Sequence, residues 1–429
     1  TANVITYRTR LAVREMGKVV GLAPETVDNL SRQLGRLDLQ QDPEALVARI
    51  GEAGVDPSAP RIARLIELVT RVQGLPRHLG QHSGGIVIAA GRLDEVVPIE
   101  PARMAGRRIV QWDKEDCADL GIIKIDLLGL GMLAALEETL PLIERHEGRA
   151  LDLAHLPPDD PDTYAMLCKA DTVGVFQIES RAQMATLPRL KPRCFYDLVV
   201  EIAIIRPGPI VGQMVHPYLN RRAGREPVRY PHPCLEPILE RTLGIPIFQE
   251  QLLRIAMTAA GFSGGEAEEL RRAMGFKRST QRMHTIEEKL RAGMERKGIP
   301  KPAQDEIVQQ VTAFALYGFP ESHSASFALI AYASAYLKCH HPAAFLTGLL
   351  NAWPMGFYSP ATLVKDAQRH GVEIRAIDVM ASRWKCTLEV GSKPGDPPAV
   401  RLGLRFTQGL REATGHWLEA ERDENPFGD

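Results

Sequence analysis

Lys124 and Asp126 stand two positions apart in an apolar run, LGIIKIDLLGL, that spans residues 120–130. If this run is a β-strand, its side chains alternate and the two charged groups share one face with Ile122. Neighbours on one face lie roughly 6.5–7 Å apart, so the pair can serve adjacent parts of one ligand. A carboxylate suits a divalent cation and an ammonium suits a phosphate, as a metal-bound nucleotide requires. The alternative is a solvent-facing ion pair at a strand end, and the strand alone leaves both open.

A dense group of cations follows a predicted helix between residues 262 and 282. Ser263 and Glu266 have capping-box spacing, so this helix is expected to begin there and to end at Gly275. The helix dipole favours cations near a C-terminus, which explains any single one of them. Five cations within about a dozen residues exceed that effect, so phosphate binding accounts better for the group. The five are Arg271, Arg272, Lys277, Arg278 and Arg282.

A third segment, residues 316–338, contains the turn YGFPES followed by an apolar helix. Ser322 is expected to be the N-cap of this helix, which places His323 in its first turn. A helix N-terminus offers free N–H groups to an anion, so His323 is a candidate contact for a sugar or phosphate. Tyr317 precedes the turn and is a candidate to stack on a base. Without the neighbouring cations, ordinary packing or capping accounts better for a single histidine or tyrosine.

Two weaker candidates lie in turns. The segment VGVFQIES, residues 173–180, is expected to be a strand or turn that carries Gln177 and Glu179 toward a site, although a structural turn is favoured. The segment IIRPGP, residues 204–209, is a rigid turn with Arg206 at its head. Prolines preset the backbone of this turn, so Arg206 is either aimed at a ligand or merely exposed.

The composition is that of an ordinary globular protein. The chain has 429 residues, 45% of them hydrophobic and 24% charged, which is enough for two or three domains with real cores. A formal net charge of −1 does not indicate a DNA-binding protein, although a neutral total can contain a local basic stripe. The six cysteines are dispersed and form no CxxC pair, which predicts reduced thiols in the cytoplasm and no zinc site.

Several classes of function find no support in the sequence. No apolar run is long enough to cross a bilayer, and the chain begins without a signal peptide. A Walker A motif, a dinucleotide fingerprint, HExxH and GxSxG are all absent. The polar start TANVITYRTRLAVRE and the end ERDENPFGD predict that the natural protein continues on both sides.

The elements that must position these residues alternate between helical and β-rich stretches. Residues 1–75 are expected to be mostly helical, and residues 82–130 are expected to form a mixed sheet of short strands. Residues 131–350 are helical again, with proline-rich joints between the helices. Strands return from residue 372. This order predicts an α+β fold.

Taken together, the segments resemble the bacterial C-family of DNA polymerases, the alpha subunit of DNA polymerase III. The resemblance covers nearly the whole chain, and several blocks in fixed order are more specific than any one of them. The blocks are, in order, HSGGIVIA, WDKEDCADLGIIKIDLLGLGML, VFQIESRAQM, RPGP, GIPIFQEQ, LRRAMG and YGFPESHSASFAL.

Two longer blocks are similar to the error-prone, ImuC-type branch of that family. They are FPESHSASFALIAY and NAWPMGFYSPATLVKDAQRHGVEIRAIDV. Glu321 in the first block stands where replicative members usually carry Lys. This departure removes one cation near the nucleotide, so phosphate contacts at that position do not transfer directly.

The resemblance implies roles for individual residues. Asp126 matches the third metal-binding aspartate of the catalytic palm domain, and Lys124 matches its phosphate-contacting partner. Arg271 and Arg272 match arginines of the fingers domain that face the triphosphate. The remaining nucleotide-binding candidates are Tyr317, which matches the base-stacking residue, Ser322, and His323 near the sugar, with Lys277, Arg206 and Gln177 as weaker candidates.

The resemblance also implies an architecture. Residues 1–150 correspond to a nucleotidyltransferase-like palm remnant with a helical insertion, residues 151–370 to helical fingers and residues 371–429 to a small β-containing element. The other two catalytic aspartates and a PHP domain are expected upstream. Helix-hairpin-helix elements, an OB domain and a clamp-binding peptide are expected after residue 429.

The implied function is template-directed DNA synthesis with two Mg²⁺ ions. The branch implies that this synthesis is error-prone and copies damaged templates (translesion synthesis) in the DNA damage response. The implied partners are primer–template DNA, dNTP, a sliding clamp and error-prone accessory proteins, with no membrane. Because one carboxylate cannot hold two metals, the 429-residue chain alone is expected to be inactive. The alternatives are a nucleotidyltransferase that copies no template and a non-catalytic DNA-binding or assembly subunit on a polymerase scaffold.

Overall fold

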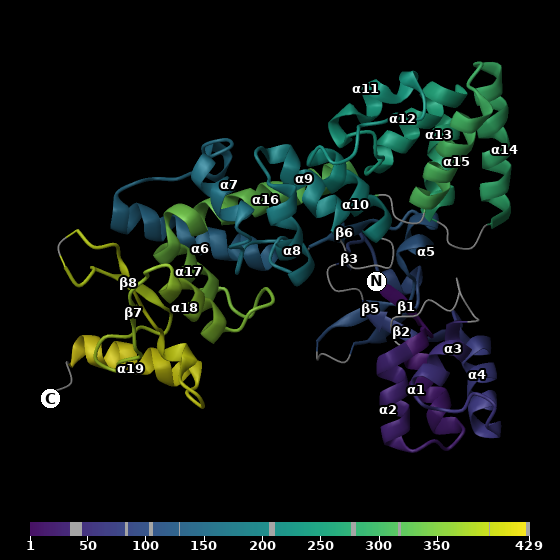
Figure 1. Cartoon of the computed structure of the whole chain (residues 1–429). Helices are drawn as coiled ribbons and strands as arrows, with labels where there is room; N and C mark the ends of the chain where they lie inside the picture. The colour runs from purple at the N-terminus through teal and green to yellow at the C-terminus, as the bar shows by residue number, and fades with distance from the viewer. Residues whose placement is uncertain are drawn as a thin grey trace. The chain divides into compact units, whose positions relative to one another are not determined.

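The computed structural model describes two compact units, Thr1–Leu128 and Gly129–Asp429. Figure 1 shows the elements of both. The α+β class expected from the sequence is confirmed. A functional division near residue 150 stays a prediction. The described residues are 1–34, 45–81, 85–102, 106–127, 129–205, 211–275, 280–315, 319–393 and 395–425.

The first unit begins with helices inserted between two paired strands. Strand β1 (Ala2–Thr6) pairs antiparallel with β2 (Pro76–Gln81), so the helices between them form an excursion from one sheet. They pack around a core that includes Leu30, Leu65 and Val69. The mostly helical character expected for this stretch is confirmed. The four helices are α1 (Thr9–Val19), α2 (Pro24–Leu34), α3 (Ala45–Glu52) and α4 (Pro60–Val72).

The rest of the first unit holds short strands. In the described residues they form separate two-stranded antiparallel sheets, not one mixed sheet. The strand expected over 120–130 is shorter, because Gly121 (φ 67°) turns the chain before it and Gly129 (φ 93°) turns it after. The elements are β3 (Gly85–Val87) paired with β6 (Lys124–Asp126), β4 (Ile99–Pro101) paired with β5 (Arg108–Val110), a 3-10 turn (Leu93–Glu95) and α5 (Lys114–Asp119).

Helix α16 (Glu321–His340) lies at the centre of the second unit, packed against α9 (Phe195–Ile204) (Figure 1). The buried Ser324 hydroxyl donates a hydrogen bond of 2.5 Å to the Val199 carbonyl, which fixes the two helices together. Other helices complete two apolar cores around it. These are α6 (Leu130–Glu147), α7 (Pro161–Cys168), α8 (Arg181–Leu190), α10 (Val211–Arg222), α17 (Pro342–Asn351) and α18 (Pro360–Arg369), with a 3-10 turn (Leu153–His155).

A further helical group in the second unit has its own core. The helix expected to begin after Ser263 is confirmed as α13 (Gly264–Gly275). Its capping box is formed, because the Ser263 N–H donates to Glu266 at 2.9 Å and the Glu266 N–H donates to the Ser263 hydroxyl at 3.3 Å. The other helices are α11 (Glu236–Leu239), α12 (Gln249–Ala260), α14 (Thr280–Arg296) and α15 (Lys301–Ala315), with 3-10 turns at Pro233–Leu235 and Glu240–Thr242.

The end of the chain combines a small mixed sheet with a helix. Strand β9 (Ala399–Arg401) pairs in parallel with β7 (Ile374–Arg375) and antiparallel with β8 (Thr387–Glu389). Asn351 of α17 exchanges two hydrogen bonds with the Cys386 backbone and so joins this sheet to the helices. The strands expected after residue 372 are confirmed. A 3-10 turn (Leu404–Phe406) and α19 (Glu412–Glu424) follow.

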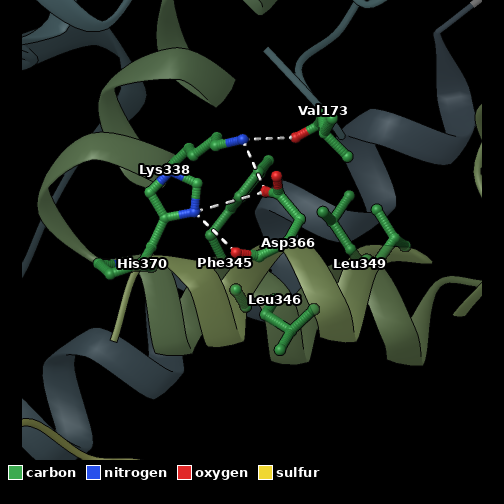
Figure 2. A pocket seen from close by; sticks show the side chains of 10 residues that line it. Val173, Lys338, Phe345, Leu346, Leu349, Asp366 and His370 are labelled. Carbon is green, nitrogen blue, oxygen red and sulfur yellow. Dashed lines mark hydrogen bonds and ion pairs between the residues drawn. The ribbon is translucent and has the colours of Figure 1, made fainter. Parts of the chain in front are cut away.

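A buried lysine joins three parts of the second unit. The Lys338 ammonium on α16 lies 3.0 Å from Asp171, 2.8 Å from Asp366 and 3.0 Å from the Val173 carbonyl oxygen. His370 adds hydrogen bonds to Asp171 and to the Asp366 carbonyl. Figure 2 shows Lys338, Asp366 and His370 at the edge of a pocket with largely apolar walls. The ligand atoms of Asp171, Asp366 and His370 lie within 4.8 Å of one another, but the Lys338 ammonium already forms ion pairs with both carboxylates.

A second buried acid, Glu201, has no such compensation. Glu201 on α9 is fully buried, and neither carboxyl oxygen has a hydrogen-bond partner within the described part of the chain. Burial therefore raises the pKa of Glu201 well above its ordinary value. The neutral form of a carboxyl tolerates an apolar surrounding better than the anion does.

All six cysteines are free thiols, and Cys117 and Cys386 are buried. Among the described residues, the search for a helix of sufficient length and hydropathy to cross a bilayer finds none.

Candidate functional site

Strand β6 carries the first pair of candidates, Lys124 and Asp126. Antiparallel pairing with β3 sets Asp126 opposite Gly85 and Lys124 opposite Val87. Residues two apart on a strand share a face, so the backbone places these two together on one side of β6. Lys124 is half-buried. The side chain of Asp126 lies outside the described residues, so its metal-binding role stays a prediction.

In the second unit, helices α12 and α16 begin side by side. Phe248 and Phe319, just before the two helices, form a parallel bridge. The Gln249 N–H donates to the Phe319 carbonyl at 3.0 Å, and the Glu321 N–H donates to the Glu250 carboxylate at 2.9 Å. Each helix N-terminus carries a partial positive charge, so two of them together make a favourable place for an anion.

The expectation that Ser322 caps α16 is wrong. The N-cap is Pro320, whose side chain makes no capping hydrogen bond, and Ser322 is exposed within the first turn. Glu250 of α12 accepts the N–H of Glu321 instead. A carboxylate from a neighbouring helix therefore takes part of the role that a local hydroxyl was expected to fill. The nucleotide-binding role of Ser322 stays a prediction.

His323 lies in the first turn of α16, as the sequence predicted. Its ring is half-buried, with ring centroids 5.1 Å from Phe319 and 4.2 Å from Phe327. These contacts are the ordinary packing that was the alternative interpretation, and they also hold the ring in a fixed place. A contact between His323 and a sugar stays a prediction.

Arg271 connects α13 to the same region. Its guanidinium makes two hydrogen bonds to Glu268, of 2.9 and 2.5 Å, and its side chain is 45% exposed. The bonds to Glu268 raise the pKa of the Arg271 guanidinium, and the charge of Glu250 adds to the rise. Helix α13 packs against α12, and Glu250 of α12 binds the N–H of Glu321 at the start of α16, so Arg271 belongs to the same group of elements as Ser322 and His323.

Other cationic and aromatic candidates cannot be placed. The side chains of Arg272, Lys277, Tyr317 and Arg206, together with those of Arg278 and Arg282, lie outside the described residues. Their proposed contacts with phosphate or base stay predictions. The two units are described separately, so the meeting of the β6 pair with Arg271 and His323 also stays a prediction.

The turn at 173–180 has a structural explanation. Gln177 adopts a left-handed backbone (φ 62°), and Glu179 is buried, with its carboxylate 2.9 Å from the Gly174 N–H. Burial raises the pKa of Glu179 to about 7, against the opposing effect of its backbone donors. Tyr358 donates to the Glu179 carbonyl at 2.9 Å and ties the turn to a second loop. This geometry fits the structural turn that was favoured, and a ligand role for Gln177 stays a prediction.

Sequence reasoning missed Glu250, Tyr196 and Arg241. Glu250 appeared only inside the block GIPIFQEQ, and its partner Glu321 is 71 residues away. Tyr196 and Arg241 both contact Glu321 from other elements. No local spacing signals such contacts. The signal that the sequence did offer was Glu321 in place of the usual Lys, since an acid among cations needs partners of its own.

Comparisons with known proteins bear on what these elements belong to. Residues 1–129 match the model of the bacterial DNA polymerase III alpha NTPase domain, and residues 132–298 match the model of the bacterial DNA polymerase III alpha subunit finger domain. The chain belongs to the bacterial DNA polymerase III alpha family. Its helices α12, α13 and α14 lie within the finger domain match, whereas α16 lies beyond it.

Relatives within the DNA polymerase III alpha family carry the name error-prone DNA polymerase. The chain is 50% identical to that of Methylococcus capsulatus over 99% of its own length and 42% of the relative's. It is 51% identical to that of Alkalilimnicola ehrlichii, with coverage of 100% and 41%. It is 52% identical to that of Anaeromyxobacter sp., over 99% of its own length and 39% of the relative's. The chain therefore spans about two fifths of these relatives, and the expected resemblance to the error-prone branch is confirmed.

The comparisons also correct one boundary. The model of a helix-hairpin-helix motif matches residues 371–429 of the chain. The family resemblance predicted such elements only after residue 429. The matched range contains the sheet β7–β9–β8 and helix α19. The strands dominated the sequence pattern there, which hid the helical motif.

Proposed function

We propose that this chain is part of a template-directed DNA polymerase that adds dNMP to a primer 3′-hydroxyl and releases pyrophosphate. The observation that carries the proposal is the joint beginning of α12 and α16, with α13, the helix of Arg271, packed against α12. Two helix N-termini and a guanidinium suit a triphosphate. The family of the chain supplies the reaction in which a triphosphate is consumed.

The residues divide the work between binding and chemistry. Asp126 offers the carboxylate oxygen that Mg²⁺ prefers, and the facing Gly85 has no side chain to crowd it. Bound Mg²⁺ would activate the primer hydroxyl and offset charge on the leaving pyrophosphate, with further carboxylates needed for a second ion. Lys124 and Arg271 would hold phosphates, and His323 would lie at the sugar. Both Glu268 and Glu250 would have to release their partners as the triphosphate arrives.

The finer assignments follow from the same proposal. DNA is the partner, with the helix-hairpin-helix range as one contact, and the relatives' name favours error-prone synthesis. Template pairing would select the nucleotide, and looseness of the closed fingers would set the error rate. A sliding clamp, accessory proteins of error-prone synthesis and a place in the cytoplasm complete the proposal.

Template dependence separates this proposal from its rivals. The full-length protein is offered one labelled primer on four templates that differ only at the first unpaired base, with each dNTP in turn. We expect each template to select its complementary dNTP in preference to the others. Addition of one dNTP regardless of template would indicate a non-templated nucleotidyltransferase. DNA binding without extension on any template would indicate a non-catalytic subunit.

A further inference from the structure

We infer that Glu321 is a positioning residue, which holds the first turn of α16 through Tyr196 and Arg241 and so sets how tightly the incoming nucleotide is bound. The inference deepens the proposed function and rests on it. It concerns a residue whose side chain contacts two neighbouring elements.

Three elements meet at the Glu321 carboxylate. The Tyr196 hydroxyl, from α9, donates to Glu321 Oε1 at 3.1 Å. Arg241, from the 3-10 turn before α12, lies with Cζ 3.6 Å from the centre of the Tyr196 ring. Arg241 Nη1 is also 4.0 Å from Glu321 Oε1. The tyrosine thus has a cation over its face and an anion at its hydroxyl, an arrangement in which each group favours the others.

The burial of the Arg241 and Tyr196 side chains shows which contact of Glu321 is the stronger. The Arg241 side chain is 68% exposed, so its distant ion pair with Glu321 is weak by itself. Tyr196 is half-buried against Phe248, with ring centroids 6.3 Å apart. Burial raises the pKa of Tyr196 and the Glu321 charge raises it further, so the hydroxyl remains a donor at neutral pH. The hydroxyl–carboxylate bond is the fixed contact, and Arg241 orients the ring.

Glu321 is held at two points. Its N–H is bound by Glu250 of α12, and its side chain is bound by Tyr196 of α9. Ser322 and His323 follow directly, so the place of these two residues depends on how Glu321 is fixed. A Lys in its place would accept no bond from Tyr196 and would bring a second cation to Arg241.

The test is a double-mutant cycle on single-nucleotide incorporation by the full-length protein. Tyr196→Phe and Glu321→Ala each remove the same bond, so each is expected to raise the KM for the complementary dNTP about fivefold, with kcat within about twofold. The double variant should be no worse than the poorer single variant, because the two share one interaction. Glu321→Gln keeps an acceptor for Tyr196 and should remain within about twofold of wild type.

Tyr358→Phe is the matched control. It also removes a tyrosine hydroxyl from a hydrogen bond in the second unit, here to the Glu179 carbonyl, and should leave KM unchanged. Additive effects of Tyr196→Phe and Glu321→Ala, or wild-type KM in both, would overturn the positioning role. A lower KM in Glu321→Gln together with no effect of Tyr196→Phe would also overturn it, because the Glu321 charge would then act directly on the triphosphate.

Failure of the inference is distinguishable from failure of the proposed function. If Asp126→Asn abolishes extension while the Tyr196 and Glu321 variants keep wild-type KM, only the positioning role falls. If the unaltered protein incorporates no templated nucleotide, the proposed function falls and the inference falls with it.

Discussion

The full-length protein carrying Asp126→Asn is expected to extend a primer about a thousandfold more slowly than wild type. Asparagine has nearly the shape of aspartate but lacks the negative charge that holds a divalent cation. The pairing of β6 with β3 uses the backbone, so the strand should persist in the variant. The loss should therefore appear in the rate of the chemical step, measured by single-turnover extension in a rapid-quench instrument.

Asp119→Asn provides the matched control for this variant. Asp119 ends α5 in the same unit and is exposed, so the same change of charge should leave the rate within about twofold. Binding of primer–template DNA should be similar for both variants. Equal rates for Asp126→Asn and wild type would remove Asp126 from the chemistry.

The second large effect is on stability. Lys338→Met is expected to lower the free energy of unfolding of the second unit by about 3 kcal/mol. Lys338 is 6% exposed and lies at 3.0 and 2.8 Å from two partly buried carboxylates. Burial alone would raise the pKa of Asp171, but the Lys338 charge holds it below its ordinary value. Methionine preserves the length of the side chain and leaves both acids without that compensation.

Lys385→Met removes a lysine of the same unit from an exposed ion pair. Lys385 lies 2.5 Å from Glu138, with 53% of its side chain exposed, and its loss should cost less than about 1 kcal/mol. Urea unfolding of the 429-residue chain, followed by circular dichroism, compares the two variants. Equal losses of unfolding free energy in the two variants would show that the buried ion pairs of Lys338 stabilise the protein no more than the exposed ion pair of Lys385.

Features with local causes could be predicted from the sequence. The Ser263–Glu266 capping box joins residues three apart, so their types and spacing suffice to place the start of α13. The shared face of Lys124 and Asp126 follows from the two-residue period of a strand. The length of β6 did not follow, because β3 and the turns at Gly121 and Gly129 limit it.

Features with distant causes could not be predicted in this way. Ser322 had the right residue type for an N-cap, but Glu250, from a helix that begins 72 positions earlier in the chain, binds the first N–H of α16. The partners of Glu321 come from α9 and from the turn that carries Arg241. Tertiary contacts of this kind override local preference. The family itself was predicted from the order of several sequence blocks, which no single spacing provides.

The central claim is that one bound nucleotide contacts both units, and photocrosslinking tests it most directly. The full-length protein is bound to primer–template DNA and a dNTP analogue with a photoreactive group on its terminal phosphate, and labelled peptides are identified by mass spectrometry. We predict labels in the peptide that contains Lys124 and in the peptide that contains Arg271, both suppressed by excess complementary dNTP. Labels confined to one unit, or unaffected by that competitor, would contradict the account.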